Sequence, residues 1–185
     1  SPRGTLLVAA LLYMVAAGVA VTRIASRPPR SSGRPSVAET WRVNAQLLSL
    51  PARRYVLIAM WVPNGLVVGC EALFVSYDPD RAGLLLACGA FGMLVGDIIA
   101  GRFFTPTWRR RLAPWLRLLL PAPYVVFAFE PAFPVAAVAV FAASIGFCAT
   151  LLLQEQLMAL TPDDMQGQAL GLQSSGMLAM QGVAA

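Results

Sequence analysis

The sequence predicts an all-α protein, a polytopic bundle of membrane-spanning helices, and three observations support this. The 185-residue chain is 58% hydrophobic and only 12% charged, with a mean hydropathy of +0.67. Soluble domains carry about 25% charged residues, so the deficit is large. Apolar runs close to the ~20 residues that cross the hydrocarbon core as a helix recur along the chain. Arginines gather in two stretches between these runs, which is typical of loops retained in the cytoplasm.

Six segments have the length and composition expected of a membrane-spanning helix. They are predicted near residues 5–22, 55–77, 82–101, 112–129, 132–153 and 165–185. Helices are expected because backbone groups in lipid must be hydrogen-bonded within their own segment. The first and fifth segments are uncharged, the fourth is short and carries Arg117 with several prolines, and the last is rich in glutamine.

Residues 23–54 are predicted to form a basic cytoplasmic linker that contains a short amphipathic helix at 36–50. The part around residues 27–35 is rich in proline, glycine and serine, which favours an extended connection. Ser36 and Glu39 have the spacing of a capping box at the start of a helix. Residues at roughly helical spacing follow: Val37, Trp41, Asn44, Leu47 and Leu48. We expect this helix to lie on the inner membrane face and to close at Pro51.

The arginines also predict the orientation of the chain. Twelve of the fourteen basic residues fall on the side of the linker and of the loop 102–111. They are Arg23, Arg27, Arg30, Arg34, Arg42, Arg53, Arg54, Arg102, Arg109, Arg110, Arg111 and Arg117. Arg3 and Arg81 are on the other side. The linker is therefore expected on the cytoplasmic side of a bacterial cytoplasmic membrane.

Several functions are disfavoured by residue types that the sequence lacks. There is no lysine for a P-loop and no histidine, the commonest general base and metal ligand. Cys70, Cys88 and Cys148 stand singly in apolar runs, which favours small buried side chains over a metal site. We therefore expect no cofactor and no metal. The net charge of +5 is explained by topology, so nucleic acid is not an expected partner.

Glu71 is the candidate for proton coupling. It precedes Tyr77 by six residues, which places it about 9 Å inside the predicted outer boundary at 1.5 Å per residue. A carboxylate at that depth costs about a few kcal/mol, so the side chain takes up a proton readily there, which is what a proton carrier needs. The alternative is a permanently protonated Glu71 that is hydrogen-bonded to a neighbouring helix.

Three further residues are candidates for a substrate pathway: Trp61, Asn64 and Gln173. Pro63 interrupts the second predicted span and leaves the carbonyl group of Ala59 without a donor. Carrier sites tend to lie near the midplane at such broken helices, although a passive kink is an equal alternative. Gln173 shares one helix face with Gln166 and Gln181, which favours either a polar pathway or hydrogen bonds between helices.

Three glycine pairs have the spacing G-x-x-x-G, which lets two helix backbones approach closely. They are Gly65–Gly69, Gly92–Gly96 and Gly167–Gly171. We expect all three pairs to serve in helix packing. Sliding of helices past each other during transport is a weaker, additional expectation.

The predicted layout begins with one span, continues with a long basic linker that contains a surface helix, and ends with several spans joined by short turns. This layout resembles the middle and second half of a major facilitator superfamily transporter. The run from Gly92 to Arg102, Gly-Met-Leu-Val-Gly-Asp-Ile-Ile-Ala-Gly-Arg, is similar to a Gly…Asp…Gly-Arg motif of that family. Members carry it between the second and third helices and, in weaker form, between the eighth and ninth. The resemblance implies a partial fold that extends from the sixth helix, at 5–22, into the eleventh.

The resemblance also implies a gating motif made of Gly92, Gly96, Asp97, Gly101 and Arg102. Asp97 would help to hold the inward gate closed. Because it lies in the last turn of its helix, where the helix dipole disfavours an anion, it needs a cation. Arg102 could supply the charge, or a helix N-terminus of a missing N-terminal half could do so. The alternative is a structural ion pair near the headgroups.

We expect a secondary active transporter and not an enzyme, working by alternating access as the resemblance implies. A proton gradient is the expected driving force, since no nucleotide motif is present. Few fixed charges favour efflux of small amphipathic or drug-like molecules. The expected partners are the lipid bilayer, a small-molecule substrate, protons and an N-terminal half of the same protein, since the sequence begins without Met and stops within an apolar run.

Three alternatives stay open at this point. The same fold could take up a small metabolite with protons. A membrane-embedded enzyme would need catalytic groups that converge at one depth, whereas Glu71 and Asp97 are expected toward opposite faces of the membrane. A non-transporting scaffold or sensor derived from the same fold is the third alternative.

Overall fold

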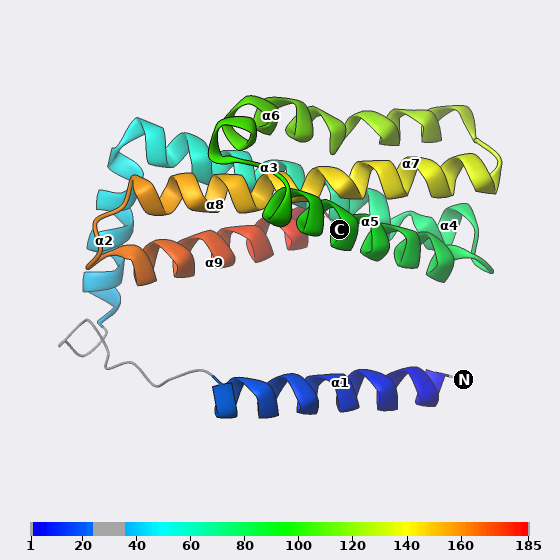
Figure 1. Ribbon diagram of the computed structural model, residues 1–185, viewed down its shortest axis with the longest axis horizontal. Helices are drawn as coiled ribbons and strands as arrows, with labels where there is room; N and C mark the ends of the chain where they lie inside the picture. The colour runs from blue at the N-terminus through cyan, green and yellow to red at the C-terminus, as the bar shows by residue number, and fades with distance from the viewer. Residues whose placement is uncertain (1, 24–35, 185) are drawn as a thin grey trace. The chain divides into compact units, whose positions relative to one another are not determined.

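The computed structural model describes residues 2–23 and 36–184, which form helices joined by turns, with no strand among them (Figure 1). The all-α class is thereby confirmed. The chain divides into two compact units, Ser1–Arg34 and Pro35–Ala185, and each is described by itself. The first unit contains the helix α1 (Pro2–Arg23), whose apolar part runs from Leu6 to Thr22. The predicted linker around residues 27–35 lies outside the described residues.

The second unit is a bundle of helices joined by short turns. Its elements are α2 (Val37–Ser49), α3 (Pro51–Ala72), α4 (Phe74–Tyr77), α5 (Ala82–Arg102), α6 (Pro106–Leu119), the 3-10 helix η1 (Ala122–Phe129), α7 (Phe133–Ile145), the 3-10 turn η2 (Gly146–Cys148), α8 (Ala149–Ala159) and α9 (Gln166–Ala184). Four helical stretches in the described residues are long and apolar enough to cross a membrane, by length and composition: Pro51–Tyr77, Ala82–Arg102, Arg111–Phe129 and Phe133–Ala159. The more polar α9 is not among them.

The short helix predicted at 36–50 is α2. Its N-cap is Ser36, whose hydroxyl accepts a hydrogen bond from the backbone N–H of Glu39 at 3.1 Å. The Glu39 carboxylate pairs with Arg42, which lowers the pKa of Glu39 from its usual range. Leu47 is buried against the bundle, whereas Trp41 is exposed. The capping prediction is confirmed at Ser36. The C-terminal half of α2 packs against the bundle.

Prolines set several boundaries that differ from the predicted ones. Pro51 does follow the end of α2, but it also occupies the first turn of α3, where its missing N–H costs nothing. The second predicted span therefore begins at residue 51 instead of 55. The fourth predicted span, 112–129, is divided into α6 and η1 because Pro121 and Pro123 cannot donate backbone hydrogen bonds.

The fifth predicted span is longer than expected and contains a break. It runs from Phe133 to Ala159 through η2, so Gln154, Glu155 and Gln156 belong to a helix. At the break, a Cβ on Gly146 would lie 2.7 Å from the carbonyl oxygen of Leu116. The absence of a side chain at Gly146 thus lets the backbone of α6 cross the α7–α8 helix at this point.

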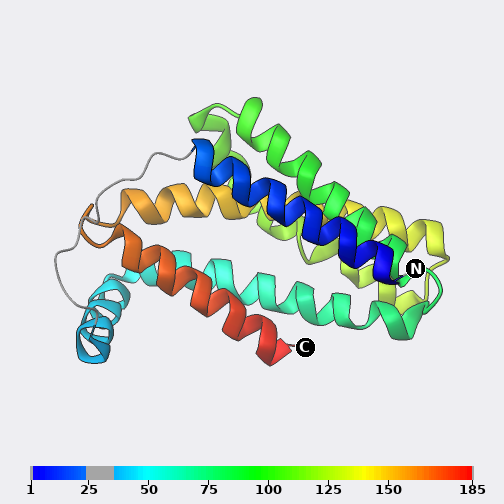
Figure 2. The same ribbon diagram turned by 90° about the horizontal axis from the view of Figure 1, so that it is seen from below.

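Two seams hold the bundle together, and both depend on glycine. Figure 2 shows α9 beside α3, where Gly65 and Gly69 face the backbone of Met180 and Ala184. In the second seam, Gly92 and Gly96 of α5 face the backbone of α7. Close approach, as predicted for these two pairs, is confirmed. Gly167 and Gly171 have nothing within 4 Å of an added Cβ, so the third pair makes no such contact in the described residues.

An aromatic cluster closes the end of the bundle at α4. Phe74 is buried and stacks on Tyr124 and Phe127 of η1, with ring centroids 6.4 and 5.8 Å apart. The Tyr77 hydroxyl donates a hydrogen bond to the carbonyl oxygen of Pro131. This cluster fixes η1 against the end of α3 and so determines what surrounds Glu71.

Candidate functional site

Polar side chains lie along one face of α3, inside the bundle. Arg53, Asn64 and Glu71 are separated by eleven and seven residues, close to three and two turns of 3.6 residues. Arg53 is 9% exposed and Asn64 is 6% exposed, while Glu71 is half-buried. Burying polar groups in this way is costly unless they find partners. This face of α3 is therefore a candidate functional site.

Two of these side chains carry nitrogen atoms that are buried without a hydrogen-bond partner. They are Nε and Nη1 of Arg53 and Nδ2 of Asn64. Arg53 was predicted to belong to the cytoplasmic linker, but it lies in the first turn of α3 and is buried. The difference arises because α3 begins at Pro51, four residues before the predicted start of that span.

Arg117 is a second, half-buried cation, which the sequence prediction counted with a loop-side cluster of arginines. It lies on α6, and its Nε and Nη2 atoms are buried without a hydrogen-bond partner. Its guanidinium stands 5.6 Å from the ring centroid of Tyr55. Together with Asn64, it lines a small cavity where α3, α6 and α8 meet.

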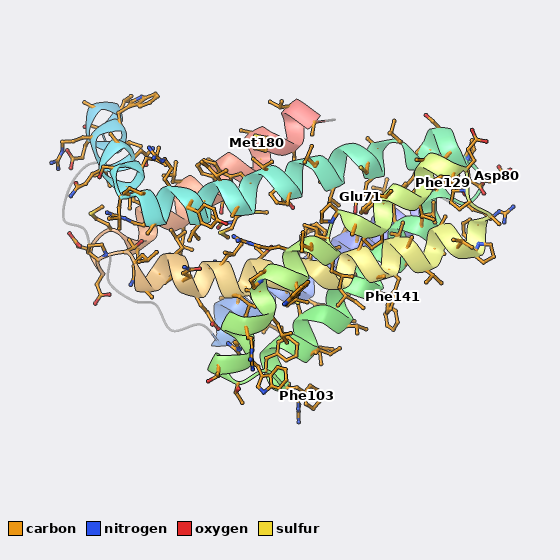
Figure 3. The ribbon with its side chains drawn as sticks, turned by 90° about the horizontal axis from the view of Figure 1, so that it is seen from above. Glu71, Asp80, Phe103, Phe129, Phe141 and Met180 are labelled. Carbon is orange, nitrogen blue, oxygen red and sulfur yellow. The ribbon has the colours of Figure 1, made fainter. Side chains whose placement is uncertain are left out.

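Glu71 lies on the same face of α3, near the aromatic cluster. Figure 3 shows its side chain leaving α3 on the side of the bundle where η1 lies. It is within electrostatic range of Tyr124, whose hydroxyl is buried without a hydrogen-bond partner. No salt bridge to Glu71 forms among the described residues. The hydrogen bond to a neighbouring helix, which was the alternative for Glu71, is likewise not formed in the described part of the chain.

Trp61 and Gln173, two of the three substrate-pathway candidates, are brought together between α3 and α9. The indole N–H of Trp61 donates to the backbone carbonyl of Gln173 at 2.9 Å. The ring occupies a notch at Gly176, where an added Cβ would lie 2.1 Å from it. The Gln173 amide reaches the sulfur of Met177. Here the two residues form a helix contact, while Asn64 faces the other side, toward α6 and α8.

The other two glutamines of the predicted α9 face do not join Gln173 in one polar row. Gln166 donates to the carboxylate of Asp163 at 2.9 Å, near the start of its own helix. Gln181 is half-buried. Instead, Gln168 donates to the side-chain oxygen of Asn44 at 2.9 Å and so joins α9 to α2. Hydrogen bonding between helices is the role that these contacts support.

The gating motif residues separate into packing glycines and exposed charges. Gly92 and Gly96 are buried in the α5–α7 seam. Asp97, Gly101 and Arg102 are exposed in this unit, and no salt bridge joins Asp97 to Arg102. The cation that Asp97 was expected to need is therefore not supplied by Arg102 in this structure.

An ion pair does form nearby, between Arg109 and Glu155. Arg109 contacts the Glu155 carboxylate of α8 and also donates to the carbonyl oxygens of Phe104 and Gly101, at 3.0 and 3.3 Å. Arg109, Glu155 and Gly101 line an open cavity of about 560 Å³ between α5, α8 and α9. Arg109 thus connects the end of α5 to α8.

The sequence prediction missed three residues that lie at this site: Arg53, Arg117 and Tyr124. Glu155 is different, because the run Gln154–Gln156 was expected at the membrane interface, with gating as its lesser alternative. A signal for Arg53 was present, since its spacing from Asn64 and Glu71 is close to whole helical turns. A signal for Arg117 was also present, since it is a charged residue within a predicted apolar span. No signal in the sequence places Tyr124 beside α3 or Glu155 beside Arg109, because both depend on how distant helices pack.

No group of three potential metal ligands occurs among the described residues. Comparisons with protein-family models, with curated proteins and with solved structures each found no match. The function is therefore inferred from the residues and from their arrangement.

Proposed function

We propose that the protein is part of a secondary active transporter of the major facilitator type, embedded in a bacterial cytoplasmic membrane with α2 on the cytoplasmic side. Four stretches long and apolar enough to span a bilayer support this proposal, as does the basic connection that precedes α3. Alternating access would move the two halves of the intact protein about a central site. Efflux of small amphipathic or drug-like molecules is the proposed direction, and uptake of a small metabolite is the alternative.

Glu71 carries the proposal, as the group that couples transport to protons. Its carboxyl is half-buried on the polar face of α3, without a salt bridge in the described residues, and within electrostatic range of the unpartnered hydroxyl of Tyr124. A carboxyl group in such a place can alternate between a neutral, protonated form and an ion exposed to water on one side. Protonation removes the cost of burying the charge, which lets the helix bundle change conformation.

The Arg109–Glu155 pair supports a gating role at the ends of α5 and α8. Arg109 holds the last turn of α5 through the carbonyl of Gly101 and holds α8 through Glu155. Because both side chains are partly exposed, the pair can break and reform at little cost. A contact of this strength suits a gate that opens in every cycle.

The test uses the intact protein in inside-out vesicles with an imposed pH gradient. Flux of ethidium and of fluorescein, a cationic and an anionic amphipathic dye, is measured for wild type, Glu71→Gln and Asp80→Asn. Asp80 is an exposed acid in the turn before α5, so its variant is the control (Figure 3). We expect gradient-driven flux to fall at least about tenfold in Glu71→Gln and to stay unchanged in Asp80→Asn.

Two outcomes would contradict this proposal. Flux in Glu71→Gln equal to wild type would remove the coupling role of Glu71. The second outcome is that wild-type vesicles move neither dye in either direction, while members of a library of small metabolites drive proton uptake. The proposed direction of transport would then change from efflux to uptake.

A further inference from the structure

The turn between α5 and α6 gathers arginines but no acidic residue. This α5–α6 corner comprises residues 101–111, and from Ile98 to Phe129 the sequence has five arginines and no aspartate or glutamate. Arg109 uses its charge within the bundle, because it pairs with Glu155 of α8. Arg102 and Arg111 are exposed, and their side chains have no ion pair or hydrogen bond among the described residues. The α5–α6 corner therefore presents positive charge that the described residues do not neutralise.

Other contacts hold the α5–α6 corner in place, so neither exposed arginine is needed for its shape. Arg109 donates to the carbonyl oxygens of Phe104 and Gly101, at 3.0 and 3.3 Å. At the start of α6, the Thr105 hydroxyl accepts a hydrogen bond from the backbone N–H of Trp108 at 3.5 Å. Because the backbone is fixed in this way, the two exposed arginines are available to a ligand.

Arg111 shares one face of α6 with Trp108, Trp115 and Leu118. Spacings of three, four and three residues place these four side chains on one stripe of the helix. The two indoles and the leucine are 56%, 69% and 59% exposed. An arginine that stands between two exposed indoles is typical of the headgroup level of a membrane, where amphipathic rings settle.

The same stripe continues into an apolar stretch that is long enough to span a membrane. This stretch is Arg111–Phe129, and little of it is buried in the described unit. At 1.5 Å per residue, Trp115 and Leu118 lie about 6 and 10 Å further along the helix than Arg111. A neighbour of this stripe must therefore offer an anion at Arg111 and an apolar surface beyond it. An anionic phospholipid has its groups in this order, whereas a soluble anion or a nucleic acid offers only the charge.

We propose that the α5–α6 corner is a binding site for an anionic phospholipid of the cytoplasmic leaflet. Arg111 holds the phosphate, since a guanidinium binds phosphate oxygens in a two-pronged fashion, and Arg102 adds to the local positive charge. The acyl chains lie along Trp115 and Leu118. The site rests on the membrane embedding proposed above, but it does not depend on transport or on Glu71.

Lipid binding to the purified intact protein in detergent tests the proposal. Phosphatidylglycerol, which is anionic, and phosphatidylcholine, which is not, are titrated separately, and bound lipid is counted by native mass spectrometry. We expect the first phosphatidylglycerol to bind at least about tenfold more tightly, because each arginine near a lipid surface contributes about fivefold in affinity. Arg111→Gln should weaken this binding about fivefold, and Arg111→Gln combined with Arg102→Gln about twenty-fivefold.

Arg54→Gln is the matched control. Arg54 is also exposed, near the start of α3, but no tryptophan lies one turn away from it on its helix. Its affinity for phosphatidylglycerol should equal that of wild type. Equal wild-type affinity for the two lipids would overturn the proposal. Equal losses in Arg54→Gln and Arg111→Gln would overturn it as well, since the attraction would then belong to the basic surface as a whole.

Brominated acyl chains quench tryptophan fluorescence on contact and so report where the chains lie. We expect brominated phosphatidylglycerol to quench more strongly than brominated phosphatidylcholine, and the difference to shrink in Trp115→Phe. Free glycerol phosphate, which carries the charged group without chains, should not displace the lipid. Full displacement would assign the α5–α6 corner to a soluble phosphate compound instead. A structure of the intact protein with another helix over Trp115 would also overturn the lipid site.

The lipid site and the transport proposal can fail separately. An intact membrane protein that shows no preference for phosphatidylglycerol would lose only the lipid site. Dye flux that is absent in vesicles, with the expected lipid preference in detergent, would remove the transport role and leave the lipid site in place. Full-length protein recovered from the soluble fraction of cells would remove both.

Discussion

Two glycine pairs with the same spacing lie in different surroundings in this protein. Gly92 and Gly96 of α5 are buried, and an added Cβ at Gly92 would lie 2.4 Å from the carbonyl oxygen of Phe141. Gly167 and Gly171 of α9 have open space where a Cβ would stand. The same sequence pattern therefore permits a close helix contact at both places, but the described residues form it only at the first.

The difference also shows how α9 is held. Its contact with α3 depends on backbone approach at Gly65 and Gly69 and on the Trp61 ring at Gly176, on the opposite half of the helix from Gly167. Gly167 and Gly171 are exposed in the described residues, whereas Gly92 and Gly96 are buried in the α5–α7 seam. Four substitution experiments test how these helix contacts differ in strength.

The largest effect is expected at the α5–α7 seam. Gly92→Ala places a methyl group 2.4 Å from a backbone oxygen and 2.8 Å from the Ser144 Cβ, so two helices must move apart. We expect the free energy of unfolding to fall by about 1–3 kcal/mol, as for other overpacked cores. Chemical denaturation in detergent measures it. Gly83→Ala, on the same helix but in open space, should show no loss, and equal losses in both variants would contradict the seam.

The next effect concerns the hydrogen bond between α3 and α9. Trp61→Phe removes the indole N–H that donates to the carbonyl of Gln173 and leaves that acceptor without its partner. The free energy of unfolding should decrease by about 0.5–1.5 kcal/mol. Trp115→Phe is the control, since Trp115 is 69% exposed. If the two variants lose the same stability, the hydrogen bond contributes nothing specific.

Gly171→Ala should act in the opposite direction. Because open space surrounds Gly171, alanine adds helix propensity without a clash, and the free energy of unfolding should rise by about 0.8–1 kcal/mol. The same denaturation series measures the change in the full-length protein. A loss of stability instead would mean that another part of the protein packs against this face of α9, which would make the two glycine pairs alike.

The smallest effect is expected for the ion pair beyond the end of α5. Arg109 and Glu155 side chains are 23% and 58% exposed, so a double-mutant cycle with Arg109→Gln and Glu155→Gln should give a coupling of about 0.2–1 kcal/mol that weakens in high salt. Arg109→Gln should cost more than Glu155→Gln, because Arg109 also donates to two backbone carbonyls. A salt-independent coupling would argue against an electrostatic pair.

Much of the fold followed from local patterns. Apolar runs predicted the helices, and the Ser36–Glu39 spacing predicted the start of α2, because these signals depend on residues close together in the chain. The breaks were harder to predict. The α7–α8 helix is interrupted at Gly146, where α6 crosses it, and no local sequence pattern indicates where two helices cross.

The candidate site was predictable only in part. Glu71 and Asn64 stood out as polar residues in an apolar segment, and both lie on the buried polar face of α3. Arg117 was taken as part of a basic cluster beside the membrane, although its guanidinium is turned into the bundle. Counting arginines by sequence position cannot separate a loop arginine from one that a neighbouring helix covers.

Local sequence is enough to specify which segments are helical and which of them are apolar, because backbone hydrogen bonding and side-chain polarity act within a few residues. Packing between helices specifies which glycines contact a neighbouring backbone, that Arg109 pairs with Glu155, and which nitrogen atoms of Asn64 and Arg117 stay without an acceptor. These outcomes depend on contacts between helices that are far apart in the chain. The spacing of residues along one helix fixes its faces but does not specify what each face will touch.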